Sequence, residues 1–199
     1  MKNILFIGEK GAGKSSLINA LIAKDALEVG DGINLCTKSE TWINVKETSL
    51  RELPGFDMSQ FEFNERILSK AIEMLTYKIY GDFKWKVDAL VVVVDASDDN
   101  KEFLDYITEC LFYRCYRDGQ KSNIVLAINK SDKLINSEAQ HINLKTVCDE
   151  QEKLYKDFFK KKCVDVTCVA CCTDGDLEHI DGSYNIDRLS KEIMRKCEV

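Results

Sequence analysis

The stretch that decides the fold of this chain reads Gly8-Glu9-Lys10-Gly11-Ala12-Gly13-Lys14-Ser15. It matches the phosphate-binding pattern G-x-x-x-x-G-K-[ST] in every required position. It follows a short apolar segment, residues 3–7, and opens a segment of helical spacing, residues 14–23, as the pattern requires. Glycines let the backbone turn so that its N–H groups point inward, and the helix start adds positive charge. We therefore expect residues 8–15, with Ser16 behind them, to bind nucleotide phosphates.

Working outward from this loop, segments with strand-like and helix-like patterns alternate along the 199 residues. Strands are expected at 3–7, 41–47, 48–53, 89–94, 123–128 and 164–169. Besides 14–23, helical spacing is seen at Ile67, Ala71, Leu75 and Ile79, at Phe103, Ile107 and Leu111, at Val147, Gln151, Leu154 and Phe158, and at Ile186, Leu189 and Ile193. This alternation predicts an α/β fold with a mostly parallel central sheet flanked by helices, the three-layer fold of P-loop NTPases. With one proline and ten glycines there is no linker-like stretch, so residues 1–199 are predicted to form a single domain.

Composition excludes several other classes of protein. The net charge of −6 is unlike that of a nucleic-acid-binding protein. Lys160–Lys162 are expected to end a helix, and a phosphate or membrane patch is the alternative. The longest apolar run, 89–94, is too short to span a bilayer, so membrane association is not indicated. Nine cysteines and two histidines lack the spacing of a disulfide scaffold or zinc site. We expect small buried thiols in a reducing, cytoplasmic setting.

The nucleotide base is indicated by Asn129-Lys130-Ser131-Asp132, which follows the apolar strand predicted at 123–128. A carboxylate at Asp132 can accept hydrogen bonds from both the N1–H and the exocyclic amine of guanine. Adenine offers no such pair of donors, and a buried carboxylate left unpaired would disfavour ATP. These residues therefore predict guanine specificity and GTP or GDP as the ligand.

The same four residues resemble the N/T-K-x-D motif of the Ras-like and Era-like GTPases. The resemblance implies that the Lys130 stem packs along the base and that Asn129 ties this loop to the phosphate loop. Ala170-Cys171-Cys172 occupies the place of the S-A-K element in those families, whose backbone N–H groups meet guanine O6.

Two segments between these loops resemble the nucleotide-sensing switches of GTPases. In the first, Thr37 is the preferred Mg²⁺ ligand and Thr41 the alternative; the string 36–39 looks like that of the immunity-associated GTPases. In the second, Glu52-Leu53-Pro54-Gly55 looks like D-[LT]-P-G of Era-like, immunity-related and septin-type GTPases. Glu52 departs from the aspartate of that pattern, and its longer side chain must still reach a Mg²⁺-bound water. Gly55 is expected to offer its N–H to the terminal phosphate.

Phe56 stands where Ras-like enzymes carry the glutamine that orients the attacking water. The chain thus resembles GTPases with a hydrophobic substitution, which complete their active sites by other means. One such means is a K⁺ ion held by an asparagine three residues before the lysine of the phosphate loop. This chain has Gly11 at that position, which disfavours activation by potassium. A group from a second protomer or an activating protein is then expected.

Together these motifs resemble the septin/Era-like side of the GTPase superfamily, closest to the immunity-associated (avirulence-induced) GTPases. The resemblance implies a Mg²⁺-dependent GTPase switch, slow as a monomer, in which Lys14, Thr37 and Gly55 act on the terminal phosphate. Ser15, Thr37 and Glu52 would hold the metal. A homodimer across the nucleotide face or an activator would complete the site. A GTP- or GDP-binding scaffold with little hydrolysis is the alternative, and a small-molecule or nucleotide kinase is a third class.

Overall fold

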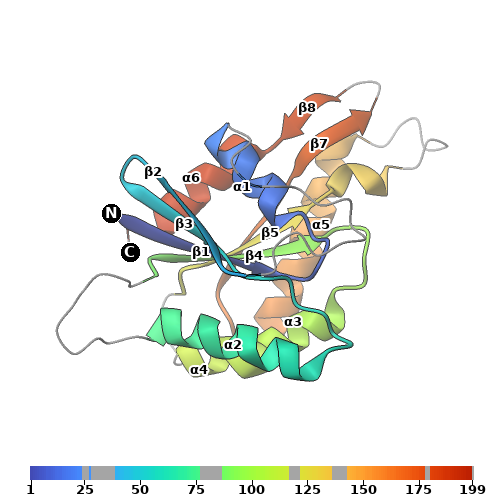
Figure 1. Cartoon of the computed structure of the whole chain (residues 1–199). Coiled ribbons are helices and arrows are strands. Elements are labelled where there is room, and N and C mark those ends of the chain that lie inside the picture. Colours follow the sequence, from blue (N-terminus) through green and yellow to red (C-terminus); the bar gives the residue numbers. More distant parts are fainter. Residues whose placement is uncertain are drawn as a thin grey trace.

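The computed structural model describes residues 1–23, 27, 39–76, 87–116, 122–135, 143–177 and 180–198. The strands of its main sheet are β1 (Lys2–Gly8), β2 (Thr41–Val45), β3 (Thr48–Glu52), β4 (Ala89–Asp95), β5 (Ile124–Asn129) and β6 (Val166–Ala170). Their order across the sheet is β2-β3-β1-β4-β5-β6 (Figure 1). Every neighbouring pair is parallel except β2 with β3. The prediction of a mostly parallel α/β sheet is confirmed.

Helices cover both faces of this sheet, which makes three layers (Figure 1). They are α1 (Lys14–Ile22), α2 (Phe61–Thr76), α3 (Lys101–Ile107), α4 (Tyr113–Cys115), α5 (Leu144–Lys161) and α6 (Ile186–Lys196). A π-helical turn, η1 (Thr108–Phe112), joins α3 to α4, and a short 3₁₀ helix, η2 (Ser131–Leu134), follows β5. Among the described residues, no helix is both long enough and apolar enough to span a membrane.

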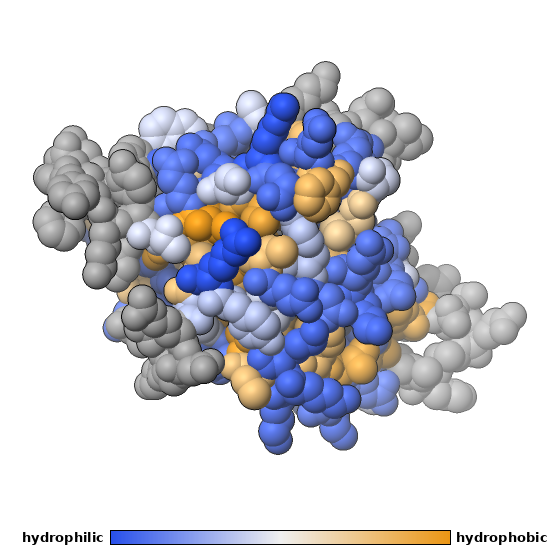
Figure 2. Space-filling view, turned by 90° about the horizontal axis from the view of Figure 1, so that it is seen from below, coloured by the Kyte–Doolittle hydropathy of each residue, from blue (hydrophilic) through white to orange (hydrophobic). Residues whose placement is uncertain are grey.

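The sequence of β1 shows how the two cores arise. Side chains alternate along a strand, so Ile4 and Phe6 pack with α1 and α6, whereas Leu5 and Ile7 pack with α2, α3 and α5. Burial of apolar side chains on both faces explains why β1, β4 and β5 are almost continuously apolar. Figure 2 shows the α2 and α3 side of the molecule from outside, where hydrophilic residues predominate and hydrophobic ones form separate patches.

The carboxyl ends of three central strands meet at one edge of the sheet. Gly8 lies opposite Val93 near the end of β4, and Asp95 lies opposite Asn129, the last residue of β5. Loops that follow these strands therefore converge, as they do in open α/β sheets that bind ligands beyond their carboxyl ends.

The second half of the chain differs from the sequence analysis at one strand and shows an unexpected buried face on one helix. The strand predicted at 164–169 is not the last one, because β7 (Cys172–Leu177) and β8 (Ile180–Tyr184) form a separate antiparallel hairpin. On α5, the line of helical spacing is only partly buried: Leu154 is 60% exposed, while Glu152 is buried. The buried positions of this helix are Leu144, Val147, Cys148, Glu152, Tyr155 and Phe159.

The other elements follow the predicted ones with shifts of one or two residues at their ends. Helix α2 carries the predicted Ile67, Ala71 and Leu75, whereas Ile79 lies outside the described residues. Lys160 and Lys161 form the last turn of α5, as expected. All eight cysteines in the described part of the chain are free thiols, of which Cys148, Cys168, Cys171 and Cys172 are buried.

Candidate nucleotide site

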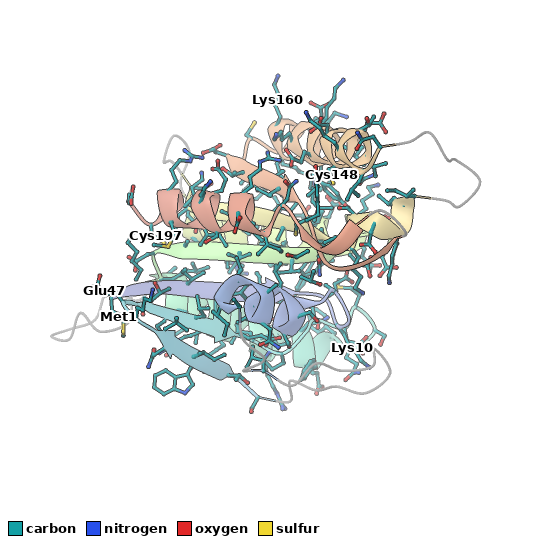
Figure 3. All side chains as sticks on the ribbon, turned by 90° about the horizontal axis from the view of Figure 1, so that it is seen from above. Met1, Lys10, Glu47, Cys148, Lys160 and Cys197 are labelled. Carbon is teal, nitrogen blue, oxygen red and sulfur yellow. The ribbon has the colours of Figure 1, made fainter. Side chains whose placement is uncertain are left out.

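The phosphate loop joins β1 to α1 through a backbone that only glycine tolerates well. Gly11 and Gly13 have φ angles of 84° and 85°, in the left-handed region. A Cβ on Gly13 would also lie 2.4 Å from the side-chain nitrogen of Asn129. The loop ends at the first turn of α1, where free N–H groups and the helix dipole favour an anion. Lys10, in this loop, lies at the opposite end of the molecule from Met1 and Glu47 (Figure 3).

Lys14 lies inside this loop with only 5% of its surface exposed. Its Nζ donates hydrogen bonds to the carbonyl oxygens of Gly8 and Glu9, at 3.3 and 3.0 Å. Burial lowers the pKa of Lys14 to about 8, although Glu52 and Glu9 oppose the shift. Burial, with the nearby charge of Asp98, raises the pKa of Glu9 to about 7. A buried ammonium at this point suits phosphate oxygens, which would replace the carbonyl partners.

Two of the three predicted metal ligands lie together. The Ser15 hydroxyl donates to both carboxylate oxygens of Glu52, at 2.8 and 3.0 Å, and Glu52 is 2% exposed. Oxygen donors of this kind fit Mg²⁺, which usually takes a few protein oxygens and completes its shell with phosphate and water. No group of three or more His, Cys, Asp or Glu side chains that could hold a metal occurs in the described part of the chain. The residues present therefore fit Mg²⁺ beside phosphates better than a cage built from protein alone.

The preferred switch threonine, Thr37, lies outside the described residues. The alternative, Thr41, is the first residue of β2, and its hydroxyl donates to the Ser39 carbonyl at 3.4 Å.

Gly55 lies against the phosphate loop. A Cβ at this position would lie 2.6 Å from the Lys10 Cα and 3.0 Å from the Lys14 Nζ, so only glycine fits. Directly after it, the Phe56 N–H donates to the Gly8 carbonyl at 3.0 Å, and the Lys10 N–H donates to the Phe56 carbonyl at 2.8 Å. The segment after β3 is thus paired with the phosphate loop through its backbone.

The Phe56 side chain points into the core. It is 1% exposed, and its ring centroid lies 5.4 Å from that of Phe103 and 6.2 Å from that of Tyr106. The Tyr106 hydroxyl in turn donates to Glu65 of α2 at 3.0 Å. A side chain at position 56 is therefore held away from the phosphate loop by aromatic packing.

The loop after β5 is bonded to the phosphate loop. Asn129 is fully buried and its Nδ2 donates to the Ala12 carbonyl at 3.2 Å. Lys130, in the left-handed region with φ 58°, donates from Nζ to the Gly11 carbonyl at 2.7 Å. Asp132 follows in η2, partly exposed, and within the described residues no hydrogen bond to its carboxylate is found. The predicted base loop and phosphate loop are therefore neighbours.

Asp95 belongs to this site, and the sequence reasoning missed it. It ends β4 with 5% of its surface exposed and accepts a hydrogen bond from Lys130 Nζ at 2.6 Å. The Ser97 hydroxyl and N–H donate to its other oxygen at 2.6 and 3.0 Å. These hydrogen bonds, with the Lys130 charge, hold the pKa of Asp95 below its usual value despite burial. The available signal was a carboxylate at the carboxyl end of an otherwise apolar strand.

The expectation for Ala170-Cys171-Cys172 needs correction. The Ala170 N–H donates to the Glu152 carboxylate at 3.1 Å, and the Cys171 N–H donates to the Ile128 carbonyl at 2.8 Å. Neither N–H is free to meet a guanine oxygen, so the prediction of base-binding N–H groups is wrong for these two residues. Cys172 begins β7 beside them. The Cys171 carbonyl instead accepts the Ser131 N–H at 3.2 Å and supports the base loop from behind.

Comparison with known proteins agrees with this geometry. Residues 3–130 match the family model described as 50S ribosome-binding GTPase. A solved structure titled as a probable GTP-binding protein engB is 21% identical, with a TM-score of 0.60 and coverage of 98% of each chain. Toc33 from Arabidopsis thaliana in complex with Mg²⁺ and GMPPNP is 15% identical, with a TM-score of 0.60, and the match covers 99% of this chain and 84% of that one.

A further solved structure is described with the statement that dimerization is important for the GTPase activity of the chloroplast translocon components atToc33 and psToc159. It is 14% identical, with a TM-score of 0.60, and the match covers 98% of this chain and 82% of that one. At these identities the structural matches establish the fold.

Proposed function

The chain belongs to the 50S ribosome-binding GTPase family, and on that premise we propose that it binds GTP and GDP with Mg²⁺ and hydrolyses GTP as a switch. One observation carries the proposal: Asn129 and Lys130 bond to the Ala12 and Gly11 carbonyls. Because these bonds join the loop after β5 to the phosphate loop, they support a site in which one loop would bind the base and the other the phosphates of one nucleotide. Asp132 is the residue proposed to read guanine.

Guanine specificity is tested by the nucleotide that co-purifies with the protein and by the variant Asp132→Ala. Two hydrogen bonds to a carboxylate contribute about 3 kcal/mol together, so the affinity for a fluorescent GDP analogue should fall about a hundredfold. Asp149→Ala, which removes an exposed acidic side chain from α5, is the matched control and should change affinity by less than about twofold. Tighter binding of an ATP analogue than of its GTP counterpart would show that the guanine assignment is wrong.

The residues proposed to hold Mg²⁺ are Ser15 and Glu52, with Thr37 as the preferred third ligand and Thr41 as its alternative. When bound, the ion neutralises part of the charge on the outer phosphates. Lys14 would stabilise the same charge from inside the loop, and the Gly55 N–H would meet the terminal phosphate. The contact of Ser15 with Glu52 at 2.8 Å supports this grouping.

Position 56 supplies no group that orients the attacking water, because Phe56 is buried against Phe103. We propose that a second copy of the chain, docked across the nucleotide face, or an activating protein supplies it. The dimerization reported for the chloroplast translocon GTPases supports the first option. Hydrolysis per molecule should then rise as protein concentration is raised about a hundredfold; a flat rate would rule out completion by a second copy.

A scaffold that binds GTP or GDP but scarcely hydrolyses it is the second candidate, and the burial of Phe56 favours it. Single-turnover hydrolysis with excess protein separates the two candidates. Release of phosphate within minutes to hours would support the GTPase switch, and none over many hours would support the scaffold.

The proposal also includes a closer relation to the septin/Era-like GTPases, and within them to the immunity-associated ones, supported by Leu53-Pro54-Gly55. It treats residues 1–199 as one domain, since a single main sheet carries both hydrophobic cores. It assigns the protein to a reducing, cytoplasmic setting, which the free thiols of the described cysteines support.

A further inference from the structure

The contact between Glu52 and Ser15 is close to what a shared metal ion would need. The Ser15 hydroxyl oxygen lies 2.8 and 3.0 Å from the two Glu52 carboxylate oxygens. Two neighbouring ligands on an octahedral Mg²⁺, each about 2.0–2.1 Å from the ion, are themselves about 2.9 Å apart. These contacts are ordinary hydrogen bonds, and their lengths also match the spacing that adjacent ligands of one ion would have.

The backbone fixes where the Glu52 side chain starts. Glu52 is the last residue of β3 and lies in register with Phe6 of β1, and the following Leu53 N–H donates to the Phe6 carbonyl at 3.2 Å. Parallel pairing on this side prevents the strand from retreating to accommodate a longer side chain. The extra methylene of glutamate, relative to the aspartate of the resembling families, therefore carries the carboxylate about 1.3 Å further toward Ser15.

Burial prevents the carboxylate from turning out to water. Glu52 is 2% exposed, and its charge acts on Lys14, whose pKa it raises against the effect of burial. The carboxylate therefore lies beside the phosphate loop, hydrogen-bonded to Ser15 and close enough to Lys14 for their charges to interact.

We propose that Glu52 is a direct ligand of Mg²⁺ beside Ser15, in place of a carboxylate that holds the ion through a bound water. The inference rests on the proposed function, because it concerns the ion that accompanies the guanine nucleotide. Glu52 takes one coordination position that a water molecule would otherwise fill.

The experiment counts water molecules on Mn²⁺, used as a spectroscopic substitute for Mg²⁺, in the complex of the full chain with GDP. In electron paramagnetic resonance spectra, ¹⁷O-labelled water bound to Mn²⁺ broadens the Mn²⁺ lines, and the extent of the broadening gives the number of bound waters. The GDP complex lacks the terminal phosphate on which the switch threonine is expected to act, so Ser15, one phosphate oxygen and Glu52 would take three positions of an octahedral ion and leave about three for water. A count of about four in the wild-type protein would overturn the inference.

Two variants make the assignment specific to this residue. Glu52→Asp, with a shorter side chain, should gain one bound water, whereas Glu47→Asp, exposed in the turn between β2 and β3 at the far end of the sheet (Figure 3), should gain none. An unchanged count in Glu52→Asp would show that another group occupies the position.

Nucleotide binding measured in EDTA, which removes the metal ion, separates the inference about Glu52 from the proposal that the protein binds guanine nucleotides. A protein that binds GDP but no Mn²⁺ would overturn the direct-ligand inference and leave guanine-nucleotide binding standing. A protein that binds no guanine nucleotide would overturn the proposed function as well. Circular dichroism of each variant confirms that the comparison is made on folded protein.

Discussion

Replacing Asp95 by Asn removes the charge that holds Lys130 beside the phosphate loop. The Asp95 carboxylate is 2.6 Å from the Lys130 Nζ, in a pair whose side chains are 7% and 27% exposed. An asparagine can still accept the hydrogen bonds from Ser97 through its remaining oxygen. Its NH₂ group would replace the oxygen that faces Lys130. The substitution therefore changes one interaction and leaves the end of β4 in place.

The expected losses of stability and of GDP affinity follow from the partial burial of the Asp95–Lys130 pair and from the length of the lysine side chain. A hydrogen bond to a charged group contributes about 1.5–3 kcal/mol, and the partial exposure of Lys130 reduces this to about 1–2 kcal/mol of unfolding free energy. Fixing a long side chain when a ligand binds costs about 0.5–1.5 kcal/mol. Without Asp95, the Lys130 side chain would be fixed only when the nucleotide binds, and the free energy of fixing it would weaken binding. The affinity for GDP should therefore drop about three- to tenfold.

The assay is a fluorescence titration with an N-methylanthraniloyl-GDP analogue, alongside urea unfolding without nucleotide. Lys133→Ala is the matched control, because Lys133 faces the same carboxylate at 3.9 Å with a side chain that is 52% exposed. Its affinity should stay within about twofold of the wild type. If Asp95→Asn binds GDP no more weakly than Lys133→Ala, Asp95 does not pre-order Lys130 and the reasoning fails.

Three further predictions concern other parts of the site and its support. The folded-state pKa of Glu9, about 7, lies above the ordinary value of 4.5, so the wild type should lose stability as pH rises from about 5 to 7. Glu9→Gln should remove this loss, and its melting temperature without nucleotide should exceed that of the wild type at pH 8 but scarcely at pH 5; a gap independent of pH would contradict this. Glu152→Ala should lower the free energy of unfolding in urea by about 2–3 kcal/mol, because it leaves Arg188 and the buried Ala170 N–H without their partner. Leu154→Ala, on the exposed face of α5, should change the free energy of unfolding by less than about 0.5 kcal/mol. Equal effects of the two substitutions would show that the buried face of α5 is misassigned. Phe56→Gln should not speed GTP hydrolysis, since position 56 faces the core, and should cost about 3 kcal/mol of stability; a faster rate would mean that the side chain can reach the phosphates.

Local patterns were sufficient to predict most of the fold. Continuous apolar runs located β4 and β5, and the glycines before Lys14 located the turn into α1, since these signals depend on neighbours in the sequence. The β7–β8 hairpin was missed because its first strand, Cys-Thr-Asp-Gly-Asp-Leu from 172 to 177, is polar and shows no clear alternation.

Helix α5 shows what a sequence pattern cannot reveal. A charged residue such as Glu152 is normally assigned to the exposed face, and Leu154 to the buried one. Here Glu152 is buried because Arg188 of α6 donates to both its oxygens, at 2.6 and 2.9 Å, and the Ala170 N–H donates to one of them. Partners from α6 and β6 decide the face, and no spacing within α5 encodes them.

The candidate site likewise contains parts that the sequence could predict and parts that depend on contacts between distant segments. The places of the phosphate loop and of the loop after β5 were predictable, because each is a short motif that directly follows an apolar strand. Asp95 was not, since its role depends on the pairing of β4 with β5, which brings it opposite Asn129 and next to Lys130. The N–H groups of Ala170 and Cys171 were misjudged for the same reason, because Glu152 and Ile128, distant in sequence, already accept from them.

The backbone bridge between Glu9 and Phe56 extends the pairing of the sheet into the nucleotide site. A terminal phosphate that draws Gly55 toward it must carry Lys10 along or break both hydrogen bonds of Phe56. Two such bonds contribute about 1–3 kcal/mol, which corresponds to a ratio of about 5 to 150 between the joined and separated arrangements. We therefore expect the segment that leads into α2 either to move together with the phosphate loop or to separate from it with the loss of both hydrogen bonds.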